Sequence, residues 1–150
     1  MKFKKYFSSF KGILIGFYLF INNNMKTILV DAWNTFFTAD GIFQEMHKML
    51  ENYSNPKMIV TNANDEQLIQ FGIDKSPYKV FTLKHNPDKV DPVYFNTLFK
   101  ELKLNNENVI YFEHNVDAVK SAESIGIKTF HYDKDKKDLV ALKQFLDENL

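Results

Sequence analysis

Five short, largely apolar runs constrain the fold of this chain more than any other sequence feature. They span residues 27–30, 58–60, 79–83, 108–112 and 128–132. Apolar runs of this length are typical of strands that are buried on both faces, as in parallel sheets covered by helices. Because amphipathic stretches separate them, we expect an α/β fold: a three-layer α/β/α Rossmann-like sandwich with a mainly parallel five-stranded sheet.

The amphipathic stretches predict the helices. Apolar residues recur at helical spacing over residues 42–50, 95–102 and 136–149. A further helix is expected to begin after Asn115, a residue suited to an N-cap, and to end at Gly126 in a left-handed conformation. These helices would cover both faces of the sheet.

Composition excludes several classes of function. The chain has 150 residues, room for one domain of ordinary size. Its 19 basic residues, all Lys, balance 19 acidic ones, so no net field favours nucleic acid or an anionic membrane. It has no Cys, which excludes disulfides and zinc–thiolate sites.

The first 24 residues differ from the rest. They hold four Lys and no acid, followed by an apolar run over 12–21 that is shorter than the roughly 20 residues needed to span a bilayer. We expect a separate segment 1–24 and a domain 25–150 that folds when it begins at Met25. If the start is misassigned and Met25 is the true first residue, we expect a cytoplasmic protein. If residues 1–24 are a signal or an anchor, we expect export or membrane association. An ordered extension is the third alternative.

Reactive side chains stand where the predicted strands end or, in the case of Lys89, just before a predicted helix. In open parallel sheets ligands bind at the carboxyl edge, where loops and helix N-termini converge. The residues at these positions are Asp31, Thr61, Asn62, Lys89, Glu113 and His114.

This set suits phosphoryl chemistry. A carboxylate such as Asp31 can attack phosphorus, while the Thr61 hydroxyl with neighbouring N–H groups can hold the phosphate oxygens. The Lys89 ammonium can offset the phosphate charge, and Glu113 can help to seat Mg²⁺. We therefore expect Asp31 and Lys89 to be catalytic, and Thr61, Asn62 and Lys89 to bind phosphate.

Over residues 26–132 the sequence resembles the haloacid dehalogenase-like (HAD) hydrolase superfamily. The resemblance assigns Asp31 as the nucleophile, Thr35 as the threonine that closes its loop, Thr61 as the phosphate-binding hydroxyl and Lys89 as the lysine before a helix. It implies the family's strand order 5-4-1-2-3. Because about 30 residues separate successive motifs, with room for a helix and little more, we expect a capless domain.

Trp33 departs from the family pattern. It stands where the family's phosphatases have a second Asp, the general acid that protonates the leaving oxygen. An indole cannot do so, and general acid–base help is typically worth about 10²- to 10⁴-fold. We therefore expect weak turnover, best with esters whose leaving group needs no proton.

A second departure is Glu113 with His114 in place of two Asp residues. The resemblance implies Mg²⁺ held by Asp31, the backbone carbonyl of Trp33 and Glu113. His114 is a poor Mg²⁺ ligand, but it titrates near neutrality and is one candidate for the missing proton donor. Asp117 is another, or it simply interacts with a helix N-terminus.

Two functions remain open. One is a weak Mg²⁺-dependent phosphatase acting on a phosphorylated substrate that, with no cap, can be macromolecular; the other is a degenerate HAD-like domain that binds a partner. A receiver domain is disfavoured, because its acidic pair follows the first strand and its acceptor Asp follows the third. His47 and His85 lack a partner acid at ligand spacing and are expected in surface or loop roles.

Overall fold

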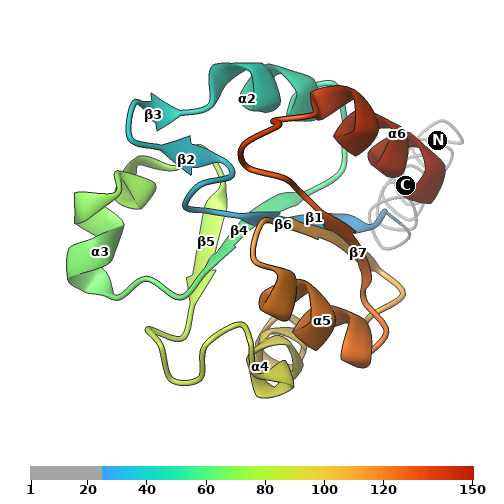
Figure 1. The fold of residues 1–150 in the computed structure, drawn as a ribbon. Coiled ribbons are helices and arrows are strands. Elements are labelled where there is room, and N and C mark those ends of the chain that lie inside the picture. The colour runs from blue at the N-terminus through green and yellow to red at the C-terminus, as the bar shows by residue number, and fades with distance from the viewer. Residues whose placement is uncertain (1–24) are drawn as a thin grey trace, which may run out of the picture.

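A five-stranded parallel sheet forms the centre of the molecule. The computed structural model describes residues 25–150, and the predicted segment 1–24 lies outside them. The strands are β1 (Thr27–Asp31), β4 (Lys57–Thr61), β5 (Lys79–Thr82), β6 (Val109–Glu113) and β7 (Lys128–His131). Their spatial order is β5-β4-β1-β6-β7, and every neighbouring pair is parallel. When these five strands are numbered 1 to 5 in chain order and the sheet is read from the β7 edge, this order is 5-4-1-2-3. The predicted sandwich and strand order are therefore confirmed, and each strand end lies within one residue of its expected position (Figure 1).

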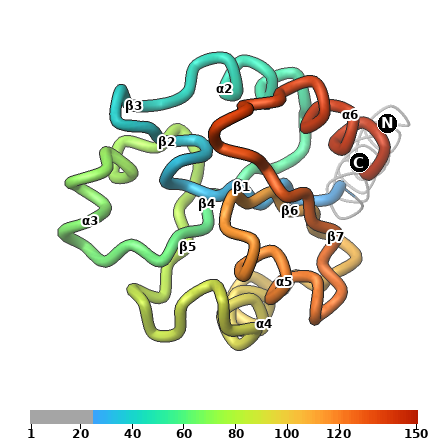
Figure 2. The backbone as a smooth tube through the Cα atoms, in the orientation of Figure 1, coloured from blue at the N-terminus to red at the C-terminus, as the bar shows by residue number. Residues whose placement is uncertain are grey.

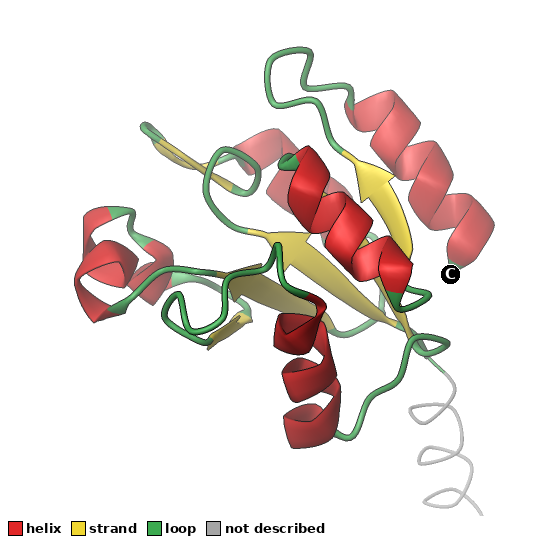
Figure 3. Ribbon diagram, turned by 60° about the horizontal axis from the view of Figure 1, so that its bottom comes forward, coloured by secondary structure: helices red, strands yellow, loops and turns green. Residues whose placement is uncertain are grey.

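Helices cover both faces of the sheet (Figure 3). They are α2 (Gln44–Leu50), α3 (Asp65–Gln70), α4 (Pro92–Leu102), α5 (Val116–Ser124) and α6 (Leu139–Asn149). Successive strand residues point to opposite faces, so Ile28 and Val30 pack into one core with α2 and α6. Leu29 packs into the other, with α4 and α5. The result is the three-layer arrangement that the apolar runs predict.

Capping fixes where the helices near the sheet's carboxyl edge begin. The Asp91 side chain accepts a hydrogen bond from Val93 N at the start of α4, where Pro92 supplies a preset φ. The Asn115 side chain accepts bonds from the backbone N–H groups of the first turn of α5, as predicted. Gly126 follows α5 with φ of 84°, the expected left-handed conformation.

The last helix is shorter than predicted. It begins at Leu139 rather than at residue 136. Lys137 has φ of 51°, which is incompatible with a helix interior, and Asp138 is the N-cap, accepting from Ala141 N. The charged turn over residues 133–138 therefore ends before the apolar stripe begins. Lys26 Nζ donates to Asn149 O at 2.6 Å, so the described part of the chain begins and ends on the same side (Figure 2).

The connections after β1 and β4 contain small elements that the sequence analysis did not predict. Between β1 and the predicted helix α2 lies a hairpin of two-residue strands, β2 (Phe37–Thr38) and β3 (Gly41–Ile42). Between β4 and β5 lie α3 and the short 3₁₀ turn η1 (Ile73–Lys75). Within residues 25–150 no helix combines the length and apolar character required to cross a membrane.

Candidate functional site

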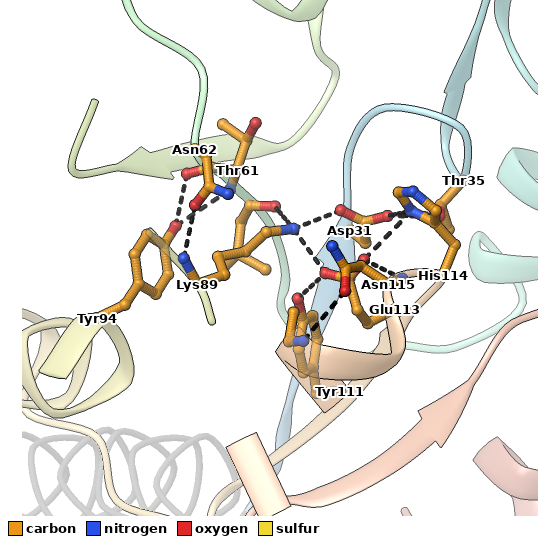
Figure 4. A network of polar contacts seen from close by, with 12 residues as sticks. Asp31, Thr35, Thr61, Asn62, Lys89, Tyr94, Tyr111, Glu113, His114 and Asn115 are labelled. Carbon is orange, nitrogen blue, oxygen red and sulfur yellow. Dashed lines mark hydrogen bonds and ion pairs between the residues drawn. The ribbon is translucent and has the colours of Figure 1, made fainter. Parts of the chain in front are cut away.

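Three of the predicted residues end three adjacent strands. Asp31 is the last residue of β1, Thr61 of β4 and Glu113 of β6. Because these strands are parallel neighbours, their last residues meet at one edge of the sheet. Lys89 reaches the same place from the loop before α4 (Figure 4).

Lys89 joins the two carboxylates. Its Nζ lies 2.5 Å from Asp31 Oδ1 and 2.6 Å from Glu113 Oε2. All three side chains are at least nine-tenths buried. A buried ammonium between two carboxylates is a charge-assisted arrangement that would be costly to break.

His114 approaches the same carboxylates from the other side. Its Nδ1 lies 2.6 Å from Asp31 Oδ2 and 3.2 Å from Glu113 Oε1. The Thr35 hydroxyl also donates to Asp31 Oδ2, at 2.5 Å. Nδ1 faces only carboxylate oxygens and a hydroxyl, so we assign to it the proton of this contact.

Glu113 has every hydrogen-bonding position filled. Oε1 accepts from His114 Nδ1 and from the backbone N–H of Asn115 at 2.8 Å. Oε2 accepts from Lys89 Nζ and from the hydroxyl of Tyr111. An ionised carboxylate has about four acceptor positions, and Glu113 uses all of them. Asp31 uses three, which leaves one lone pair on Oδ1.

The charges of this cluster stabilise one another. Burial alone would lower the pKa of Lys89, but the Asp31 and Glu113 carboxylates outweigh it and raise that pKa. Burial alone would raise the pKa of Glu113, but Lys89 and hydrogen bonds from His114 and Tyr111 lower it. Hydrogen bonds to Asp31 and then Glu113 raise the pKa of His114 to about 9. At neutral pH Lys89 and His114 therefore carry positive charges and Glu113 a negative one.

Thr61 and Asn62 lie on the opposite wall of the site. Tyr94 from α4 donates its hydroxyl to Thr61 O at 2.8 Å and accepts from Thr61 N at 3.1 Å. The Asn62 side chain accepts from Lys89 N at 2.7 Å, which fixes the loop that carries the lysine. Asn62 thus positions Lys89, in addition to lining the pocket with Thr61.

Trp33 forms an apolar wall. Its indole stacks on Phe71, with ring centroids 4.3 Å apart and planes 25° apart. Both rings line the pocket that contains Asp31 and Lys89. The position of the family's general acid is therefore occupied by an aromatic shelf that can contact a ligand but cannot give it a proton.

The pocket itself is small. Its volume is about 150 Å³, below the roughly 300–1,000 Å³ usual for sites that enclose a whole small molecule. At its rim lie His85 and Gln67. His85 Nδ1 lies 2.8 Å from Asp88 Oδ1 and its Nε2 lies 2.7 Å from Gln67 Oε1. His85 thus lies on a loop, as expected, but it has a hydrogen-bonding partner acid, Asp88, that the sequence analysis did not name.

Two groups of residues differ from the sequence-based expectation. Asp117 does not line the pocket; its exposed side chain pairs with Lys120 at 3.4 Å. Tyr111 and Asn115 were missed, although both contact Glu113. The contact of Tyr111 with Glu113 could have been predicted, since residues two apart on a strand share a face.

The expected magnesium site would have to form at the cluster of Asp31, Glu113 and His114. Asp31, Glu113 and His114 each offer a ligand atom, and these atoms lie within 4.8 Å of one another. However, an imidazole nitrogen is a poor partner for Mg²⁺, and Glu113 has no lone pair left for a cation. As folded, the site does not fit Mg²⁺.

Solved structures identify the architecture. A HAD family enzyme from Bacteroides thetaiotaomicron, in complex with magnesium and inorganic phosphate, matches with a TM-score of 0.57 at 10% identity, over 71% of this chain and 93% of that one. The chain has the HAD-like fold. The core domain of a presumed phosphoglycolate phosphatase from Streptococcus pneumoniae matches with a TM-score of 0.55 at 15% identity, over 82% of this chain and 96% of that one.

A third structural match is an uncharacterized protein from Corynebacterium glutamicum, with a TM-score of 0.54 and 14% identity, over 82% of this chain and 96% of that one. No protein-family model matches the sequence, and no curated protein matches it. The resemblance drawn from Asp31, Thr61 and Lys89 is thus confirmed at the level of the HAD-like fold.

Proposed function

We propose that this HAD-like domain is a weak phosphate-monoester hydrolase in which Asp31 is the nucleophile. The observation that carries the proposal is the convergence of Asp31, Thr61 and Lys89 in one small pocket at the carboxyl edge of the sheet. The presence of a HAD family enzyme with bound phosphate and of a presumed phosphatase among its structural neighbours supports it.

The free lone pair of Asp31 Oδ1 defines the attacking atom. It would form a bond to phosphorus as the bond between phosphorus and the ester oxygen breaks, and the leaving group would keep that electron pair. Lys89 lies beside Oδ1 and would offset the charge of the phosphoryl oxygens. Water would then attack phosphorus in the aspartyl phosphate and release inorganic phosphate.

Trp33 determines which esters can react. It offers no proton to the leaving oxygen, so alkoxides would be poor leaving groups and aryl oxides much better ones. An aryl group leaving along the shelf formed by Trp33 and Phe71 could also stack on the indole. We therefore propose activated aryl phosphates as the preferred substrate class.

The volume of the pocket favours large substrates over enclosed metabolites. A cavity of about 150 Å³ accommodates the phosphoryl group and leaves the remainder of the ester outside. The connections after β1 and β4 supply only short elements to cover it. A capless domain of this kind would accept a phosphoryl group carried by a macromolecule.

The alternative is a noncatalytic binding domain. It is favoured by one specific observation: Lys89, Thr35 and His114 all donate to Asp31, which is 2% exposed. A carboxylate held so firmly is a weaker nucleophile than a free one. The same residues would then bind a phosphorylated ligand without cleaving it.

Hydrolysis of 4-nitrophenyl phosphate distinguishes the two functions. The wild type is expected to show slow turnover, and Asp31→Asn none. Asp117→Asn is a matched control, because Asp117 is exposed and outside the pocket. Equal turnover by the wild type and Asp31→Asn, or none by either with phosphate still bound, would favour the binding function.

A further inference from the structure

Two donors join the same two carboxylates in a closed ring. Lys89 Nζ contacts Asp31 Oδ1 and Glu113 Oε2, at 2.5 and 2.6 Å. His114 Nδ1 contacts the remaining oxygens, Asp31 Oδ2 at 2.6 Å and Glu113 Oε1 at 3.2 Å (Figure 4). Each carboxylate thus gives one oxygen to the lysine and the other to the histidine.

The second pair of oxygens is where a cation would have to bridge the strands. Asp31 ends β1 and Glu113 ends β6, and a cation bound by both would lie between Oδ2 and Oε1. The His114 N–H already lies there. It adds a shared donor between two buried carboxylate oxygens that otherwise accept only from the Thr35 hydroxyl and from the backbone N–H of Asn115.

We propose that the His114 side chain takes the place of a divalent cation in this pocket, so that the pocket binds a phosphoryl group without a metal ion. The imidazole N–H orients Asp31 from one side, as Lys89 does from the other. The ligand class is a phosphate monoester or inorganic phosphate. Only the phosphate part of the inference rests on the proposed function. The exclusion of metal rests on the closed ring of contacts between Lys89, His114 and the two carboxylates.

Contacts from two further segments hold His114 in place. Thr35 Oγ1, from the loop after β1, lies 3.4 Å from Nδ1. His131 on β7 has its Nε2 3.0 Å from the backbone carbonyl of His114. The ring is only 23% exposed, so the contact belongs to the folded core of the site and not to a surface side chain.

Replacing His114 tests the inference. His114→Asp restores a carboxylate at this position, and His114→Asn offers an amide oxygen without adding charge, which guards against misfolding of the first variant. His47→Gln is the control, because His47 lies on α2, outside the pocket. Circular dichroism in EDTA establishes that each variant is folded.

Metal binding is measured without any substrate. Thermal melting with EDTA, Mg²⁺ or Mn²⁺ is expected to give the same Tm for the wild type and for His47→Gln, and a higher Tm with metal for His114→Asp and, less strongly, His114→Asn. The single tryptophan, Trp33, lines the pocket and gives a second readout, since Mn²⁺ bound nearby would quench its emission.

Phosphate binding is measured by the same emission. Titration of the wild type with inorganic phosphate is expected to give equal affinities, within about twofold, in EDTA and in Mg²⁺. His114→Asp is expected to lose at least tenfold in EDTA and to recover with Mg²⁺.

The outcomes separate the two proposals. Three results would overturn the role of His114. The first is a metal-dependent rise in the Tm of the wild type, and the second is phosphate binding by the wild type that requires Mg²⁺. The third is metal binding by neither the wild type nor the His114 variants. Failure of the wild type to bind phosphate under any condition, with the metal results as expected, would instead overturn the proposed function.

Discussion

Lys89 is expected to be the most important single side chain for the stability of the site. Replacing it by Met keeps the volume of the side chain but removes the cation between Asp31 and Glu113, both nine-tenths or more buried. Removing one partner of a buried ion pair typically costs about 3–5 kcal/mol, because the other charge is left uncompensated. His114 remains and offsets part of the loss, so we expect about 3 kcal/mol at neutral pH.

Urea denaturation followed by circular dichroism measures this cost, and for a chain of this size it corresponds to a drop in Tm on the order of 10 °C. Lys120→Met is the matched control: its partner Asp117 lies 3.4 Å away and both side chains are about two-thirds exposed, so about 0–1 kcal/mol is expected.

The pH dependence of that cost follows from Glu113. Its folded pKa is lowered below 4.5, so its contribution to stability is present above that pH and is lost as the pH falls. Without Lys89 the buried carboxylate resists ionisation, and the penalty of Lys89→Met should shrink between pH 7.5 and pH 5. A cost below 1 kcal/mol at pH 7.5, or one that grows on acidification, would refute the reasoning.

Three further predictions follow from other parts of the structure. Because the folded pKa of His114 is raised to about 9 from 6.5, its contribution to the free energy of unfolding is fully present below pH 6.5 and is lost as the pH rises through 9. Between pH 6 and pH 9.5, urea denaturation should show the wild type losing about 1–3 kcal/mol more stability than His114→Gln. An equal loss in both proteins would contradict this prediction. Trp33→Asp should raise the turnover of alkyl phosphates, by up to ~10²- to 10⁴-fold, with little gain for 4-nitrophenyl phosphate; equal gains for both esters would argue against a missing general acid. Gly126→Ala should cost about 1–2 kcal/mol in urea denaturation because φ is 84° there, and an unchanged midpoint would show that the turn relaxes.

Much of the fold could be predicted because its signals are local. The apolar runs identify all five strands of the sheet, and Asn115 and Gly126 bound a helix by their own backbone preferences. The start of α6 was missed because it depends on the left-handed Lys137 and the Asp138 cap, not on the apolar stripe. The hairpin of β2 and β3 has strands of two residues, too short for any periodicity.

In the site, too, features with a local sequence signal could be predicted and long-range contacts could not. Asp31, Thr61 and Glu113 could be named because strand ends in a parallel sheet must meet at one edge, and Lys89 because it stands just before a helix that begins at that edge. Contacts between distant segments could not be predicted. The stack of Trp33 on Phe71 and the contact of His114 with Asp31 join residues whose separation carries no periodic signal.

His85 and Asp88 are a different case. They are three residues apart in one loop, close enough for a local hydrogen bond. Metal-ligand spacing does not predict this contact, but the local spacing of a hydrogen-bonding partner does.

The covalent state of Asp31 during turnover tests the central claim most directly. With Trp33 in place of a residue that could activate water, hydrolysis of the aspartyl phosphate should be slower than its formation. Rapid mixing with 4-nitrophenyl phosphate in EDTA should therefore give a burst of nitrophenolate of up to one equivalent per chain. Mass spectrometry after acid quench should find one phosphoryl group on the peptide that contains Asp31, absent in Asp31→Asn. Neither burst nor adduct, in a protein that binds phosphate and is folded, would contradict the account.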